Sequence, residues 1–256
     1  MTEKAAGEET FISHLVELRN RLIYITIGVA VVCGALFIYP GPARIYDIIA
    51  EPMIASLPIG AKMIATGVIS PFLVPMKVTL LLSFILALPW VFYQVWAFVA
   101  PGLYQHEKRL VLPLVVSSSL LFMSGVAFCY FFVFGRVFKF IGEFAPTSIA
   151  VTPDIENYLD FVMSMCLAFG ATFEVPVVVV ILVRMGIVSV AKLKEIRPYV
   201  VVGAFVIAAI VTPPDIVSQF ALAVPMWILF ELGLLIAPAF VRATQAPEET
   251  PESGKA

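Results

Sequence analysis

The sequence predicts an all-α membrane protein with six transmembrane helices. Of its residues, 61% are hydrophobic and 13% are charged, whereas soluble domains carry about 25% charged residues. Apolar segments long enough to form spanning helices recur along nearly the whole chain, and a hydrocarbon core needs about 20 such residues per helix. An even number of spans would put both termini on the same side of the membrane.

The predicted spans lie near 21–39, 76–99, 110–136, 158–184, 197–211 and 217–237. The fifth is short: about 14 residues separate Arg197 from Thr212, or roughly 21 Å of helix. A re-entrant segment remains an alternative, but we favour a short span that thins the bilayer locally. It would form a hairpin with the short sixth span at "TPPD", where Pro213 and Pro214 end one helix and Asp215 caps the next.

The distribution of basic residues predicts the orientation. Most Lys and Arg residues lie in the N-terminal segment, the loops near 100–109 and 185–196 with their helix ends, and the C-terminal tail. The opposite face has only Arg44, Lys62, Lys77, Arg136 and Lys139. Because positive residues concentrate on the cytoplasmic side, both termini are expected there.

The loop after the first span, residues 39–75, is too polar and too rich in proline to cross the membrane. Ile45, Ile48, Ile49 and Met53 nevertheless recur at helical spacing. We therefore expect a short interfacial helix followed by an irregular loop.

The chain divides into an N-terminal cytoplasmic segment (1–20) with an amphipathic start to span one, an integral membrane domain (21–237) and a disordered cytoplasmic tail (238–256). The apolar run after the acidic N-terminus is too long for a signal peptide and has no cleavage site, so the first span should be retained. No internal repeat is evident.

Several function classes are not supported. A net charge of −2 gives no basic surface for nucleic acid. Cys33, Cys129 and Cys166 lie apart in apolar runs, as expected of free thiols rather than a disulfide framework or a metal site. His14 and His106 belong to no ligand set, and there is no Walker A, HExxH or CxxC sequence, so we expect no cofactor and no metal. Enzymatic activity is not expected either, because no nucleophile lies beside a base; Ser117–Ser119 are better explained by helix packing.

Two groups of polar residues remain. The first lies at the expected cytoplasmic face, where Glu17 and Glu107 are accompanied by Arg19, Lys108 and Arg109. These residues are either interfacial charges that anchor helix ends or a pair of carboxylates that binds a cationic ligand.

The second group lies within spans and contains Gln94, Glu174, Gln219 and Glu231. A charge at the centre of a bilayer is costly, so Glu174 should face the protein interior or a hydrated cavity. Either it is a protonated carboxyl that hydrogen-bonds across helices, or it lines a functional polar hollow that Pro176 helps to form by kinking the helix. An ion-coupled secondary transporter, with Glu174, Gln94 and Glu231 along a solute path, is the alternative function.

Four motifs, "HLVELRNRL", "YQVWAFVAPGLYQHEKR", "FEVP" and "TPPDIVSQ", occur in order between His14 and Glu231. Together they resemble the TatC family, the multispan receptor subunit of the twin-arginine protein translocase. Phe230 departs from the family's pattern, in which many members carry Tyr.

The resemblance implies a cup-shaped six-helix protein of the bacterial cytoplasmic membrane that binds the twin-arginine signal peptides of folded cargo. Glu17 and Glu107 would receive the two arginines. The side chains that would shape the surrounding surface are Arg19, Phe98, Leu103, Tyr104 and Lys108. A planar guanidinium suits carboxylates better than an ammonium does, so Lys should replace Arg poorly in such a signal.

The resemblance also places Glu174 on the concave side of the cup. There it would hydrate the hollow for polar parts of a partner helix or signal hairpin. The implied partners are TatA-like and TatB-like single-span proteins, further copies of the chain and the lipid bilayer, and export would be driven by the proton gradient. Partner contacts are expected at Gln94, Thr212, Asp215 and Gln219.

Overall fold

The computed structural model of this protein describes residues 2–57, 62–99, 111–144, 152–212 and 215–242. Within these ranges the chain is helical apart from connecting loops and one isolated bridge between Ile64 and Asp154. The elements are α1 (Thr2–Ile38), α2 (Pro42–Ile54), α3 (Ser70–Leu86), α4 (Leu88–Val99), α5 (Val111–Phe128), the π-helix η3 (Cys129–Val133), α6 (Phe134–Phe144), α7 (Ile155–Phe173), α8 (Val175–Arg184), α9 (Val190–Glu195), α10 (Arg197–Val211) and α11 (Ile216–Arg242).

Four helical stretches in the described ranges are long and apolar enough to cross a membrane: Ser13–Ile38, Leu112–Glu143, Ile155–Arg184 and Ile216–Ala239. The pair α3 and α4 qualifies as a fifth, bent by 54°. The apolar helix α10 is shorter, as its sequence predicted. The all-α membrane fold is confirmed, and the arrangement fits six passes with a short fifth one.

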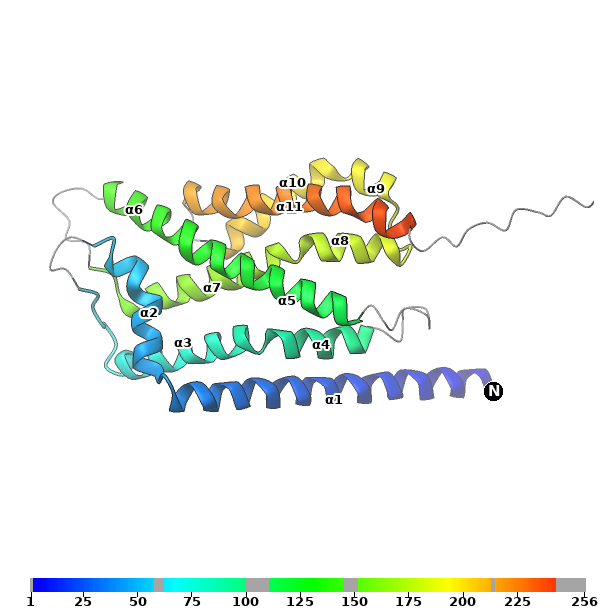
Figure 1. The fold of residues 1–256 in the computed structure, drawn as a ribbon, viewed down its shortest axis with the longest axis horizontal. Coiled ribbons are helices and arrows are strands. Elements are labelled where there is room, and N and C mark those ends of the chain that lie inside the picture. The colour runs from blue at the N-terminus through cyan, green and yellow to red at the C-terminus, as the bar shows by residue number, and fades with distance from the viewer. Residues whose placement is uncertain (1, 58–61, 100–110, 145–151, 213–214, 243–256) are drawn as a thin grey trace, which may run out of the picture.

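The long helices run side by side and alternate in direction along the molecule (Figure 1). The start of α1 lies at the same end as the end of α4, the start of α5 and the end of α11, and we call this the near end. At the opposite, far end lie the end of α1, α2, the start of α3, the end of α6 and the start of α7. The hairpin of α10 and α11 stops short of the end of α6, which fits a locally thinner membrane.

Two spans are interrupted next to a proline. Helix α3 ends before Ala87, and Pro89 in α4 has no N–H to donate to the carbonyl one turn earlier, which accounts for the bend. Helix α7 ends before Glu174 and α8 begins at Val175, with Pro176 in its first turn. The sequence predicted this second break.

The predicted helix after the first span is confirmed as α2. It packs against protein as well as facing outward: Ile45 is 1% exposed, whereas Ile48 is 53% exposed. The hydroxyls of Tyr130 and Tyr158 donate to the main-chain carbonyls of Ile48 and Ile49, each at 2.7 Å. Helix α2 is thereby fixed to η3 and α7.

The central core lies between η3, α6, α7, α10 and α11, with Phe134, Phe169 and Met165 fully buried. Helix α5 approaches α7 closely through Gly125, where an added Cβ would lie 2.5 Å from the carbonyl oxygen of Phe169. Close backbone approach through small residues is how helices associate in lipid. Helix α1, by contrast, packs mainly on α3 and α4 and lies at one side of the molecule (Figure 1).

The outer segments differ slightly from the predicted boundaries. The helix that carries the first span begins at Thr2, and α11 continues to Arg242, whereas the tail was expected from 238. Residues 243–256 lie outside the described part, and the division into three segments stays a prediction.

Candidate functional site

A polar cluster joins α1 to α4 towards the near end. Glu17 and Arg21 lie one turn apart on α1, and their side chains form an ion pair at 3.4 Å. Arg21 also donates from Nη1 to Oε1 of Gln94 on α4 at 3.0 Å. Gln94 is 2% exposed, so the amide is a buried anchor for Arg21. Through Arg21, the Glu17 carboxylate is therefore linked to the buried amide of Gln94 and kept in place on the surface of α1.

Two further contacts fix the same pair of helices. The indole N–H of Trp90 donates to the main-chain carbonyl of Tyr24 at 2.9 Å, and Trp90 lies against Gly28, which has no side chain to displace it. Nearer the end of α4, the rings of His14 and Phe98 lie 5.0 Å apart between centroids. The surface that carries Glu17 is therefore rigidly positioned beside the residues that precede position 100.

Glu174 is half-buried at the junction of α7 and α8, on the side that faces α5. Its neighbours on α5 are the Ser118 side chain and the Phe122 backbone. Oε1 of Glu174 and the Ser118 hydroxyl are buried near one another, but among the described residues neither atom makes a hydrogen bond of regular geometry. Buried polar atoms without partners are uncommon and costly, which marks this point as one with unused hydrogen-bonding capacity.

The turn between α10 and α11 carries three predicted residues. The Thr212 hydroxyl donates to the carbonyl of Ala208 at 2.8 Å and is buried. Asp215 accepts from the backbone N–H of Ser218 at 2.7 Å, which confirms its predicted capping of the last helix. Gln219 is half-buried one turn further along α11.

The remaining polar residues of the spans do not join Glu174. Glu231 forms an ion pair with Arg197 of α10 at 2.7 Å, and Gln94 belongs to the α1–α4 cluster. Sequence analysis grouped both with Glu174, because each lies in an apolar run. Gln94 and Glu231 thus have separate partners, and within the described ranges neither lies with Glu174 along a common path, so the transporter alternative is not favoured.

Comparison with known proteins gives the family. The chain matches the family described as "Sec-independent protein translocase protein (TatC)" over residues 13–225. It is 50% identical to TatC of Azotobacter chroococcum mcd 1 over 236 residues, which cover 92% of this chain and 91% of that one. The chain belongs to the TatC family.

Further relatives agree. TatC of Escherichia coli K12 is 49% identical, with 94% of this chain and 93% of the relative covered. A crystal structure of the twin-arginine translocase receptor TatC superposes with a TM-score of 0.77 at 35% identity, covering 90% of this chain and 100% of the other. The TatC family identifies the chain as a component of a protein translocase rather than an enzyme.

The predicted TatC recognition surface is partly described. Glu17, Arg19 and Phe98 lie on the near-end faces of α1 and α4, and Arg19 is exposed, 3.4 Å from the side-chain oxygen of Asn20. Leu103, Tyr104, Glu107 and Lys108 lie outside the described residues. Sequence reasoning missed the role of Arg21 as the partner of Glu17, although their four-residue spacing is a recognisable signal.

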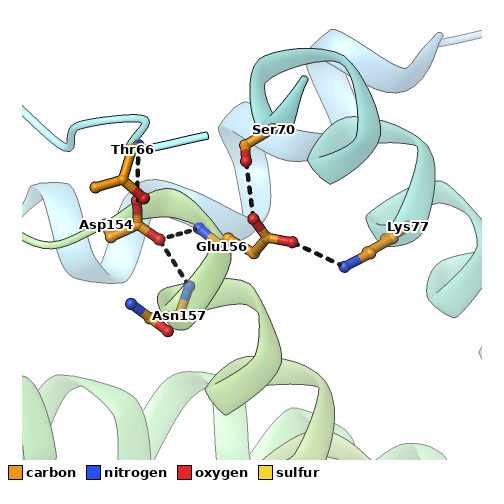
Figure 2. A network of polar contacts seen from close by, with 6 residues as sticks. All are labelled: Thr66, Ser70, Lys77, Asp154, Glu156 and Asn157. Carbon is orange, nitrogen blue, oxygen red and sulfur yellow. Dashed lines mark hydrogen bonds and ion pairs between the residues drawn. The ribbon is translucent and has the colours of Figure 1, made fainter. Parts of the chain in front are cut away.

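A second polar network, at the far end, was not predicted. Asp154 accepts from the Thr66 backbone N–H and hydroxyl and caps α7 through the N–H groups of Glu156 and Asn157. Figure 2 shows Glu156 reaching α3, where Ser70 donates to one carboxylate oxygen and Lys77 pairs with the other. The "PDIEN" sequence carries an N-cap signal, but its partners on α3 are distant in sequence.

This far-end network fixes the start of α7 to the loop before α3. The hydrogen bonds from Thr66 above all lower the pKa of Asp154 to about 2. Nothing in the network resembles a ligand site: among the described residues, no group of three His, Cys, Asp or Glu is close enough to hold a metal ion. We interpret the network as a structural clasp.

Proposed function

We propose that this TatC protein is the receptor that binds the twin-arginine signal peptides of folded cargo at the near end of the molecule. The near end would face the cytoplasm, with both termini there, in the inner membrane of a bacterium. Glu17 and Glu107 would bind the two arginines, and Arg19, Phe98, Leu103, Tyr104 and Lys108 would shape the surface around them.

The observation that carries the proposal is the state of Glu17. Its side chain is 34% exposed, and Arg21 holds it from one side while Gln94 holds Arg21. The carboxylate keeps accepting capacity, and a guanidinium can engage it with two parallel hydrogen bonds. Because the helices are already fixed, little side-chain entropy would be lost on binding.

The other parts of the molecule would serve assembly. TatA-like and TatB-like single-span helices would contact the short α10–α11 hairpin at Thr212, Asp215 and Gln219, and further copies of the chain would complete a complex in the lipid bilayer. Glu174, whose carboxylate oxygen Oε1 makes no regular hydrogen bond within the described ranges, would keep a polar hollow for an entering segment. Export would draw on the proton gradient.

The test is binding of a synthetic twin-arginine signal peptide to the purified protein, compared with its Lys-Lys counterpart. We expect Glu17→Ala and Glu107→Ala each to weaken Arg-Arg binding by about tenfold, the loss of a charge-assisted hydrogen bond. Glu195→Ala is the matched control, because Glu195 is also paired with a basic residue of its own helix, Lys192 at 3.0 Å.

Equal binding of the Arg-Arg and Lys-Lys peptides would contradict the proposal. So would equal affinities of the Glu17→Ala, Glu107→Ala and Glu195→Ala variants for the Arg-Arg peptide.

A further inference from the structure

An apolar groove of about 530 Å³ runs between the η3–α6 segment and α11. It falls within the range of about 300–1,000 Å³ that is usual for small-molecule sites. Its lining is aromatic and aliphatic except for one residue, Arg136. The lining residues are Phe128, Phe132, Val133, Arg136, Val137, Ile216, Val217, Phe220, Ala221, Val224 and Pro225.

The groove is open to the surroundings of the protein. Ile216 is 74% exposed, Phe132 and Phe220 are each 52% exposed, and Val224 is 38% exposed. In a membrane protein these side chains face hydrocarbon or another membrane-embedded group. Only the floor of the groove, with Val133 and Val137, is buried.

The depth of Arg136 follows from the length of its span. The apolar stretch runs from Leu112 to Glu143 over 32 residues, whereas about 20 helical residues cross a hydrocarbon core of about 30 Å. Its charged side chains, Arg136, Lys139 and Glu143, all lie in its last turns, as expected of residues at the level of the lipid headgroups. Helix α11 begins on this side of the membrane at Ile216, so both walls of the groove end at the same interface.

Arg136 differs from Lys77 and Lys139 at this end of the molecule. Lys77 pairs with Glu156 at 3.3 Å and Lys139 pairs with Glu143 at 3.8 Å. Among the described residues, no acidic side chain forms an ion pair with Arg136. Its Nη1 donates to the Phe132 carbonyl at 3.0 Å, and Cζ lies 5.7 Å from the centroid of the Phe132 ring.

These two contacts orient the guanidinium at the groove and leave most of its five N–H donors for a ligand. The nearby acidic residue Asp215 lines a different cavity, between α6 and α7, and accepts from the N–H of Ser218. The groove therefore combines a cation, no carboxylate and an apolar channel that leads into the membrane.

We propose that this groove binds one phospholipid, with an acyl chain between η3–α6 and α11 and the phosphate on Arg136. A phosphate oxygen pair matches the guanidinium fork, and the apolar lining matches the chain. The lipid would fill the channel between α6 and the first turns of α11, and so support the short hairpin that α11 forms with α10.

Native mass spectrometry of the delipidated protein, titrated with phosphatidylglycerol, tests this proposal. We expect Arg136→Gln to weaken retention of the first lipid by about tenfold, as for loss of a charge-assisted contact. Arg44→Gln, which removes an exposed arginine of α2 at the same end, should leave retention unchanged. Diacylglycerol with the same chains should bind the wild-type protein as weakly as phosphatidylglycerol binds Arg136→Gln.

A second pair of variants tests the channel. Val224→Trp fills the groove and should reduce lipid retention, whereas Val202→Trp, on an exposed face of α10 (62% exposed), should not. Thermal melting in detergent shows that each variant is folded. If inorganic phosphate alone displaces the lipid from wild-type protein, Arg136 binds a free anion rather than a lipid headgroup. That result would overturn the lipid assignment.

The proposal is also overturned if Arg136→Gln and Arg44→Gln lose lipid equally, or if Val224→Trp retains it. A photo-crosslinker at position 224 that captures a protein helix in native membranes, and no lipid, would assign the groove to a partner instead.

Discussion

Glu17 and Arg21 lie four positions apart on a helix, as do Lys139 and Glu143, yet the first pair is held in place much more firmly than the second. The side chains of Lys139 and Glu143 are 76% and 64% exposed at a separation of 3.8 Å, and such surface pairs contribute little. Arg21 is 27% exposed and is tied to the buried Gln94. The pair on α1 is therefore preorganised, which favours it as a binding surface.

Glu174 carries a prediction at the same scale. If its carboxyl serves as a polar contact, Glu174→Gln should retain most cargo export, because the amide keeps hydrogen-bonding groups at that position. Glu174→Ala should impair export, because alanine offers no polar group to an entering segment at that position. The measurement is the rate of export of a folded Tat substrate in cells with equal amounts of each variant.

If Glu174 instead relays protons, Glu174→Gln should fail to export cargo, because an amide cannot carry a proton through the site. Failure of both variants would therefore favour a relay. Export at the wild-type rate by all variants would remove Glu174 from the mechanism. Thr172→Val is the control for a general loss of polarity, because the Thr172 hydroxyl is likewise buried without a partner among the described residues.

Individual polar residues were predicted less well than spans. Gln94 and Glu231 lie in apolar runs and were grouped with Glu174, but their partners are 73 and 34 residues away. Nothing local in the sequence marks those partners. Asp215 was predicted correctly because a helix cap depends only on its own next turn.

At the scale of elements, the spans were predictable because the thickness of the hydrocarbon fixes the length of an apolar run. The break at Pro176 was predicted for a similar local reason. The π-helix η3 and the crossing of α5 over α7 were not, since both depend on which side chains meet. At Gly125 those two helices approach closely enough that an added Cβ would meet the Phe169 carbonyl oxygen.

Because of that contact, we expect substitution by alanine to change the stability of the protein in opposite directions at Gly125 and at Gly135. Gly125→Ala should destabilise the protein by about 1–3 kcal/mol, because the new methyl would lie 2.5 Å from the Phe169 carbonyl oxygen, which belongs to the backbone and must shift. Gly135→Ala on α6 meets nothing within 4 Å. It should be neutral or stabilise by up to about 1 kcal/mol, because alanine favours helix.

Thermal unfolding in detergent, followed by circular dichroism, measures both glycine variants against the wild type. A midpoint for Gly125→Ala equal to that of Gly135→Ala would mean that α5 and α7 are not closely packed in solution.

At the scale of the whole molecule, the two ends have different chemistry. The near end presents the Glu17 cluster on two adjacent antiparallel helices, α1 and α4, whereas the far end is closed by α2 and by the network of Asp154 and Glu156 (Figures 1 and 2). Thr66 and Asp154 are 88 residues apart in sequence, so the clasp joins the first half of the bundle to the second. Its loss should affect the stability of the fold rather than peptide recognition.

The clasp makes stability dependent on pH in a defined window. The pKa of Asp154 falls from 3.8 to about 2 on folding, chiefly because Thr66 donates to the carboxylate. A depressed pKa stabilises the folded state above the unfolded value, and that contribution disappears as the pH falls from about 4 to about 2. Asp154→Asn cannot titrate, so its melting temperature should fall less steeply than that of the wild type across this window.

Thr66→Ala supplies the second arm of the experiment, because it removes the leading cause of the shift while keeping the carboxyl. The pKa of Asp154 should move back towards its ordinary value, so the loss of stability on acidification should be smaller than in the wild type and should be complete at a higher pH. Both variants should bind the Arg-Arg peptide with wild-type affinity at neutral pH, since Glu17 lies at the other end of the molecule. If the melting temperature of both variants fell with decreasing pH as it does in the wild type, Asp154 would not link the two halves of the fold.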